Sequence, residues 1–446
     1  MTTVGIPTLE LEDIQGGILD PRPSPYVGRY FLLRIDDRHV GRELLRRLIP
    51  VVAADAATPD HPGQNVWVNV GFTYQGLKAL GVPPESLDSF APEFQEGMAA
   101  RAELLGDVGE SAPAHWEEPL GTSDVHVTVA CLSPDAARLE ATLAPALAAI
   151  NELAGVEIVF RQDCYQLPTG RTSFGFKDGI SNPQVEGGPP GPPSQERPVK
   201  AGEFILGYPD ETGNLPPMPY PEALGRNGTY AVFRKLHTRV AAFRQYLRDH
   251  SDGPEAEELL AAKMVGRWPS GAPLVLCPDR DDPALGEDPQ RNNDFLYFDD
   301  DERGFKCPAG AHARRMNPRD ALKGEIVDVN LHRLMRRGTS YGPMLPDGVL
   351  DDDGIDRGIV FIFIGAHLKR QFEFAKSQWA NEGIFIGYTE KDPIVGANDE
   401  TGTFTVPGRP VRRRLPGLPR FVVTRGGEYC FMPGLRALNW LADLDT

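Results

Sequence analysis

Apolar residues follow two different spacings in successive stretches of the chain. Some stretches alternate apolar and polar residues one by one, as half-buried strands do, and others repeat an apolar residue every three or four positions, as amphipathic helices do. In the first half these patterns predict the order strand, helix, strand, strand, helix, strand, which is the ferredoxin-like arrangement. The expected elements are a strand at 27–35, a helix at 38–49, a strand at 65–72, a short helical region at 74–80, a strand at 124–132, a helix at 134–153 and a strand at 156–167.

The second half echoes the first. Four residues recur after 200 positions, and in both places a strand pattern leads into a helical one; they are Gly28, Tyr30, Arg34 and Val40, repeated as Gly228, Tyr230, Arg234 and Val240. Such self-similarity indicates duplication. The patterns predict strands near 228–235, 358–364, 384–388 and 420–431, with helices at 237–249, 255–265 and 369–380. We therefore expect an α+β fold of two duplicated ferredoxin-like modules, each an antiparallel sheet flanked by helices.

Prolines and glycines mark the boundary between the halves. Residues 186–198 contain five prolines and three glycines, a composition that disfavours regular structure. The sequence predicts an N-terminal module at 1–185, a linker or insertion at 186–226 and a C-terminal module at 227–446.

Composition excludes several classes of function. The 446 residues carry a net charge of −17 with a pI near 5.0, which argues against nucleic acid and anionic membranes as partners. No apolar run approaches the ~20 residues that span a bilayer, and the start of the chain does not resemble a secretory signal. The five scattered cysteines fit a reducing compartment. We expect a cytoplasmic protein.

A lone histidine lies in a basic segment. From Gly310 to Arg337 there are seven Lys or Arg residues against three acids, so this segment is positive in an acidic chain. Arginine forks bind carboxylates well, and His312 has no second His or Cys at zinc-ligand spacing. An imidazole among arginines therefore suits an iron porphyrin, with its two propionates, better than zinc.

Two further segments can supply acid/base and electrostatic chemistry. Asp178 lies in Phe174–Pro183, where glycines on either side let a flat ligand approach the main chain; an ordinary β-turn is an equal alternative on residue types alone. In Leu334–Pro343, Arg336 precedes a glycine turn. Over a haem iron an arginine would polarise bound peroxide, whereas elsewhere it would be a solvated charge.

Together these segments resemble the dye-decolourising peroxidases (DyP-type haem peroxidases). The chain carries their opening Asp-Ile-Gln-Gly-Gly-Ile-Leu at 13–19, the Gly-x-x-Asp-Gly motif at 175–179 and the Cys-Pro-x-x-Ala-His string at 307–312. An Arg-Gly-x-x-Tyr-Gly-Pro stretch at 337–343, Gln-Phe-Glu-Phe at 371–374 and Gly-Glu-Tyr-Cys-Phe-Met-Pro-Gly at 427–434 also match. The matches span nearly the whole chain, and the length resembles a longer-chain, bacterial-like subgroup.

The resemblance implies a role for each matching residue. Asp178 would be the distal acid/base, His312 the proximal iron ligand and Arg336 the distal arginine, with Arg337 as the alternative if the register differs by one. Haem b would lie in the C-terminal module, with Gly179, Ile180 and Ser181 over its plane or near its propionates. Arg314, or else Arg315, would bind a propionate, and Glu373 is a candidate acceptor for the N–H of His312. Ser340 replaces the proline of the family pattern.

The implied reaction is the reduction of hydrogen peroxide to water through a ferryl porphyrin radical, which then oxidises dyes, phenols or similar one-electron donors. Because an aspartate of pKa ~3.9 stays an active base in mild acid, we expect an acid-leaning pH optimum. Two alternatives stay open: a haem-binding or haem-handling protein without significant turnover, and a duplicated binding module without haem. Aromatic residues that could relay electrons from surface donors are Trp268, Trp379, Tyr341 and Tyr429, although core packing explains each one better.

Overall fold

One large antiparallel sheet organises the protein. The computed structural model describes residues 8–54, 66–192, 194–323, 327–387 and 389–444. The strands of the large sheet are β1 (Val27–Ile35), β2 (Trp67–Phe72), β3 (Val127–Ser133), β4 (Val156–Tyr165), β5 (Thr229–Thr238), β6 (Met335–Arg336), β7 (Thr339–Tyr341), β8 (Gly358–Gly365) and β11 (Val422–Met432). A separate hairpin pairs β9 (Gly402–Val406) with β10 (Arg413–Leu418).

The strand order shows the duplication directly. The sheet runs β4-β1-β3-β2-β11-β5-β8-β6, with β7 also paired to β8. Numbered within its own half, each set of four follows the order 4-1-3-2: β4-β1-β3-β2 in the first half and β11-β5-β8-β6 in the second. The predicted α+β fold with two ferredoxin-like units is confirmed. The boundaries at 185 and 227 stay a prediction, because the two units share one sheet.

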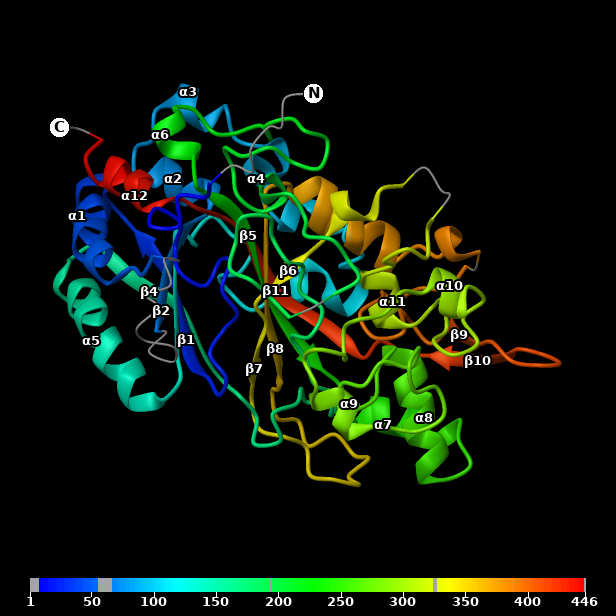
Figure 1. Cartoon of the computed structure of the whole chain (residues 1–446). Coiled ribbons are helices and arrows are strands. Elements are labelled where there is room, and N and C mark those ends of the chain that lie inside the picture. The colour runs from blue at the N-terminus through cyan, green and yellow to red at the C-terminus, as the bar shows by residue number, and fades with distance from the viewer. Residues whose placement is uncertain (1–7, 55–65, 193, 324–326, 388, 445–446) are drawn as a thin grey trace, which may run out of the picture.

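Helices cover the outside of the sheet (Figure 1). In the first half these are α1 (Arg38–Leu48), α2 (Tyr74–Ala79), α3 (Pro84–Leu87), α4 (Pro92–Glu96) and α5 (Ala136–Glu152). In the second half they are α6 (Glu222–Gly225), α7 (Val240–Asp249), α8 (Pro254–Val265), α9 (Pro283–Glu287), α10 (Phe298–Asp301), α11 (His312–Met316) and α12 (Leu435–Ala442). Short 3₁₀ turns lie at Ile49–Val51, Ala99–Arg101, Gly109–Ser111, Pro113–His115, Ala201–Glu203 and Val329–His332.

Local signals explain the long helices of the first half. Asp37 accepts hydrogen bonds from the N–H groups of His39 and Val40 at the start of α1, and Asp135 caps α5 in the same way. Apolar residues at helical spacing then bury one face of α5 against the sheet; they are Leu139, Leu143, Ala146 and Ile150. In Figure 1, α1 and α5 lie together with the C-terminal α12 beside the strands of the first half.

The two halves meet at one register position, and a strand of each half approaches the other on the far side. Phe431 of β11 pairs with Phe72 of β2, and both rings are fully buried. On the far side, β7 approaches β4, and the hydroxyls of Tyr30 and Thr339 lie 3.0 Å apart. Strands of the two halves therefore come together at two places in the structure.

Two predicted elements differ from the structure, and the predicted linker or insertion at 186–226 contributes residues to the core. Residues 384–388 were expected as a strand, but Ile384–Ile386 form a 3₁₀ turn that ends at Gly387 with φ of 77°; residue 388 lies outside the described residues. The helix expected at 369–380 is two consecutive π-helical segments, Leu368–Glu373 and Ala375–Ala380, a rare geometry that is frequent at functional sites. Within the expected linker, Phe204, Ile205 and Tyr208 are core residues.

Among the described residues, no helix combines the length and the apolar character required to cross a membrane.

The junction of the halves predicts a stability effect. Because Phe72 is fully buried at the only register position that joins β2 to β11, Phe72→Ala should lower the free energy of unfolding by about 3–5 kcal/mol. Urea denaturation measures this. Phe305→Ala is the matched control, since Phe305 is 37% exposed; a loss below about 1 kcal/mol at Phe72 would contradict the central place of this contact.

Candidate functional site

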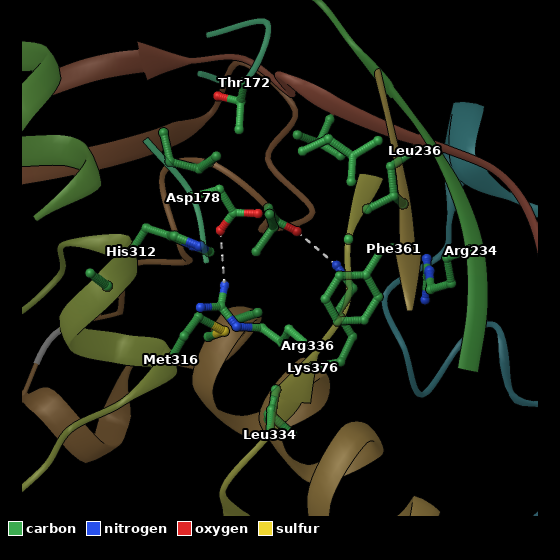
Figure 2. Close-up of a pocket in the computed structure, with 18 of the residues that line it drawn as sticks. Thr172, Asp178, Arg234, Leu236, His312, Met316, Leu334, Arg336, Phe361 and Lys376 are labelled. Carbon is green, nitrogen blue, oxygen red and sulfur yellow. Dashed lines mark hydrogen bonds and ion pairs between the residues drawn. The ribbon is translucent and has the colours of Figure 1, made fainter. Parts of the chain in front are cut away.

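The sequence-predicted residues surround one cavity. It measures about 260 Å³, just below the range of about 300–1,000 Å³ that is usual for small-molecule sites. Strands β5, β8 and β11 contribute one wall, and helix α11, the π-helical segment Ala375–Ala380 and the Asp178 loop contribute others. Most lining residues belong to the second half, but Gly106, Asp107, Ser111 and the Asp178 loop come from residues before 185. Figure 2 shows Asp178, Arg336 and His312 directed into this space.

The Asp178 loop has a backbone that only glycine adopts easily. Gly175 and Gly179 have φ values of 88° and 84°, in the left-handed region that disfavours side chains. The N–H of Thr172 donates to the carbonyl of Phe176, the N–H of Gly175 donates to the carbonyl of Thr172, and the N–H of Lys177 donates to the carbonyl of Pro269. The loop is therefore held from both ends, and Asp178 projects from its middle.

Asp178 and Arg336 lie side by side (Figure 2). The carboxylate Oδ1 is 3.7 Å from Nη1 of Arg336, which is longer than a hydrogen bond. Each group thus keeps hydrogen-bonding capacity for a small molecule. The side chain of Asp178 is 33% exposed, but the space that it meets is the cavity.

Two arginines set the charge state of Asp178. Burial raises the pKa of Asp178, while the charges of Arg336 and Arg22, the N–H of Gly179 and His312 together lower it more. The net result is a pKa below the ordinary value, so the carboxylate stays ionised in acid. Arg22 stacks on the ring of Tyr26 at 4.9 Å and, with Asp178, lines a small adjoining cavity.

The side chains of Arg336 and Arg337 point in opposite directions from the strand. Arg337 turns away from the cavity and donates to the carbonyls of Gly17, Ile18 and Leu19 at 2.8–3.0 Å. Its neighbour Arg336 lines the cavity. Of the two candidates for the distal arginine, the geometry therefore favours Arg336.

His312 begins helix α11, and its ring is held by a carboxylate. Nδ1 lies 2.9 Å from Oδ2 of Asp392. Burial raises the pKa of Asp392, but His312, Arg315 and the N–H of Val395 lower it more, so the carboxylate stays charged. Glu373, the candidate from the sequence, is elsewhere: it binds Arg101 and the hydroxyl of Tyr429. Asp392, which the sequence did not identify, is the residue that holds the His312 ring through Nδ1.

Most of the arginines expected at the cofactor carboxylates have other partners. Arg314 does not line the cavity, since it donates to Asp301 and to the carbonyl of Cys307. Arg315 donates to the carbonyls of Trp379 and Glu382. Their positions do not support the predicted propionate contact. Arg333 does line the cavity, and it forms an ion pair with Glu196.

The three residues after Asp178 also face the cavity, and their predicted contact with a haem stays a prediction. Gly179, Ile180 and Ser181 all line the cavity, and Ser181 accepts a hydrogen bond from Arg267 at 3.0 Å. At the position where the family pattern has proline, the N–H of Ser340 donates to the hydroxyl of Tyr26 at 2.8 Å. A proline could not make this bond.

The four aromatic residues considered for electron relay are core residues. Trp268, Trp379, Tyr341 and Tyr429 are each 3% exposed or less. Packing accounts for all four, as expected from the sequence.

The cavity fits a flat iron porphyrin in its chemistry. It offers one imidazole fixed by a carboxylate, as metal-binding histidines usually are. Its walls are largely apolar, and cationic side chains lie among them for carboxylate groups. The apolar lining includes Phe176, Val265, Leu334, Ile359, Phe361, Phe372 and Ile394. The described residues contain no group of three or more His, Cys, Asp or Glu that could hold a metal ion without such a cofactor.

Arg22 and Asp392 were missed for the same reason. Arg22 lies in a proline-rich stretch more than 150 residues before Asp178, and Asp392 follows His312 by 80 residues. Neither lies in a motif with recognisable spacing. Only the tertiary contacts mark them.

Comparison with known proteins agrees with this site. A family profile described as "DyP dimeric alpha+beta barrel domain" matches residues 13–158. The chain is 32% identical to Dye-decolorizing peroxidase msp1 of Mycetinis scorodonius, over 83% of this chain and 75% of that protein. It is 29% identical to Multifunctional dye peroxidase DyP2 of an Amycolatopsis strain, over 84% and 82% of the two chains.

Solved structures give the same result. An ancestral D-type dye decolorizing peroxidase superposes with a TM-score of 0.84 at 31% identity, covering 97% of this chain and 99% of that one. A dye-decolorizing peroxidase in complex with 2,6-dimethoxyphenol has a TM-score of 0.84 at 29% identity, covering 97% and 100%. Since fungal proteins are prominent among the relatives, the bacterial-like subgroup stays a prediction. The chain belongs to the dye-decolourising peroxidase family, and the enzyme class predicted from its sequence, a haem-dependent peroxidase, is confirmed.

Proposed function

We propose that this protein reduces hydrogen peroxide to water, using electrons from dyes, phenols or similar small aromatic donors, with haem b bound through His312. The observation that carries the proposal is the position of Asp178 and Arg336, 3.7 Å apart, in the cavity that His312 also lines. The relatives support it, since they are named as dye peroxidases, and one was solved with 2,6-dimethoxyphenol.

The haem would supply the two electrons that reduce peroxide and take them back one at a time from the donors. His312 would hold the iron through Nε2, because Nδ1 faces Asp392. The negative Asp392 increases the basicity of the imidazole. For a haem carboxylate we propose Arg333 and Asn317, which line the cavity near α11, in place of Arg314.

Asp178 would move the proton. Its carboxylate takes a proton from one oxygen of hydrogen peroxide and returns it to the other, so that water leaves. Arg336 stabilises the negative charge that develops as the oxygen–oxygen bond breaks. Because the two side chains do not hydrogen-bond to each other, a peroxide beside them in the cavity can accept from Arg336 and donate to Asp178.

The rival function, a haem carrier or a protein that releases iron from haem, is less well supported. Such a protein needs His312 and a cavity, but it does not need an ionised carboxylate beside a guanidinium. The cytoplasmic location stays a prediction; the five cysteines are free thiols, which agrees with it without testing it.

Removing either distal group should slow the reaction with peroxide. We expect Asp178→Asn to lower the second-order rate constant by roughly 10²–10⁴-fold and Arg336→Leu by roughly 10²–10³-fold. Stopped-flow absorbance of the haem-loaded protein measures this. Asp347→Asn and Arg161→Leu are matched controls on exposed residues. Unchanged kinetics in both distal variants would leave the haem-carrier function standing.

The pH profile should report the arginines beside Asp178. Because they hold the pKa of Asp178 below its ordinary value, the wild-type rate should persist in acid and fall only below about pH 4. Arg22→Gln removes one of these charges, so its rate should begin to fall at a higher pH. The measurement is the peroxide rate constant against pH at fixed ionic strength. An alkaline optimum in the wild type would exclude Asp178 as the base.

The partner of His312 predicts a change in haem binding. Asp392→Asn keeps a hydrogen-bond acceptor but removes the charge, so haem affinity or activity should fall by roughly 10–100-fold. Titration of the apoprotein with haem measures the affinity. Glu373→Gln is the matched control, since Glu373 binds Arg101 and Tyr429 instead. Equal losses in the two variants would mean that Asp392 acts only through stability.

A further inference from the structure

The side chain of Asn182 hydrogen-bonds to the main chain of Arg336 as a neighbouring strand would. Its Oδ1 accepts from the N–H of Arg336 at 3.0 Å, and its Nδ2 donates to the carbonyl of the same residue at 3.2 Å. A carboxamide that bonds both main-chain groups of one residue reproduces what a neighbouring strand would supply. Asn182 therefore acts on the backbone of Arg336 and leaves its guanidinium unengaged.

Arg336 needs such a partner because of its place in the sheet. Strand β6 is only two residues long and is the last strand of the sheet order. Arg336 is opposite Phe363 of β8, and the N–H that donates to β8 belongs to Arg337, which bonds the carbonyl of Ile362. By the alternation of an antiparallel pair, the N–H and carbonyl of Arg336 face away from β8. They face Asn182.

The carbonyl of Arg336 has a second donor, whereas its N–H depends on Asn182. Nη1 of Arg337 donates to this carbonyl at 3.2 Å. For the N–H, the acceptor recorded among the described residues is Oδ1 of Asn182. Loss of the amide would leave a partly buried N–H without its acceptor and free the short strand to shift.

Asn182 is itself held firmly. It precedes Pro183, which restricts it to extended backbone, and it follows Ser181, which accepts a hydrogen bond from Arg267. Arg267 is fixed in turn by the carbonyls of Gly271 and Asn292. The anchor is therefore rigid, and it lies four residues after Asp178 on the same loop.

We propose that Asn182 is a positioning residue that sets the distance between Asp178 and Arg336. One loop carries the carboxylate and also the clamp on the arginine, so the two catalytic groups keep their 3.7 Å separation even if the loop moves as a whole. This inference rests on the proposed function, since it assumes that the pair reacts with peroxide.

Asn182→Ala tests the proposal in the haem-loaded protein. Because a displacement of about 1 Å in a catalytic group can cost 100-fold in rate, we expect the peroxide rate constant to fall roughly 10- to 100-fold. Cyanide association, a binding reaction in which hydrogen cyanide must also give up its proton near the iron, should slow in parallel. In the profile of rate against pH, the fall at low pH should begin at a higher pH, because Arg336 moves away from Asp178. A loss of stability alone would not produce this change.

Gln184→Ala is the matched control. Gln184 lies on the same loop and bonds the carbonyl of Pro192, so its loss loosens the loop without touching Arg336, and wild-type kinetics are expected. If Asn182→Ala does not take up haem, Asn182→Leu replaces it, since leucine has nearly the shape of asparagine without either hydrogen-bonding group. The same slow rates and shifted pH profile are expected.

The outcomes distinguish the positioning role of Asn182 from the proposed peroxidase function. Wild-type rates and pH profile in the Asn182 variants, with slow Arg336→Leu and Asp178→Asn, would overturn the positioning role alone. Wild-type rates in Arg336→Leu and Asp178→Asn as well would overturn the proposed function itself. An equal loss in Gln184→Ala would assign the effect to general loosening of the loop and would also overturn the positioning role.

Discussion

The alternation of side chains along a strand governs this site. Successive residues of a strand point to opposite faces, so once β6 pairs with β8, Arg336 must face the cavity and Arg337 must face away. Arg337 then donates hydrogen bonds to the carbonyls of Gly17, Ile18 and Leu19, and these bonds hold the N-terminal segment against the sheet. Two identical residues thus take unrelated roles. A one-residue change in this register would exchange them.

Asp178 in the cavity and Asp392 behind His312 are carboxylates in two different surroundings. Asp178 is near arginines but lies just beyond hydrogen-bond distance from Arg336, so its charge is stabilised while its lone pairs remain available. Asp392 instead makes a direct bond to His312 and accepts from the N–H groups of Ile394 and Val395. The first arrangement suits proton transfer, and the second suits a fixed support.

The two halves share their strand order, but equivalent residues in them have different partners. Arg34 and Arg234 occupy equivalent positions in the two halves, yet Arg34 pairs with Glu157 at the surface, whereas Arg234 is buried with Asp107 and Thr424 beside the cavity. The cavity lies mainly between strands and helices of the second half. The first half contributes the Asp178 loop and closes the interior. The two copies of the fold therefore have different roles: the first half mainly supports the structure, and the second half carries most of the site.

The sequence by itself determined the elements that local patterns encode. Periodicity located β1, α1, α5, β5 and β8 within a few residues, and the glycines at 175 and 179 marked the loop that carries Asp178, because both signals act over neighbouring residues. It did not determine which arginine has which partner. Arg314 and Arg315 bind carbonyls, Arg22 arrives from the N-terminal segment, and Asp392 supports His312 across 80 residues. Those choices depend on which side chains the tertiary structure brings within a few ångströms of one another, and no local pattern contains that information.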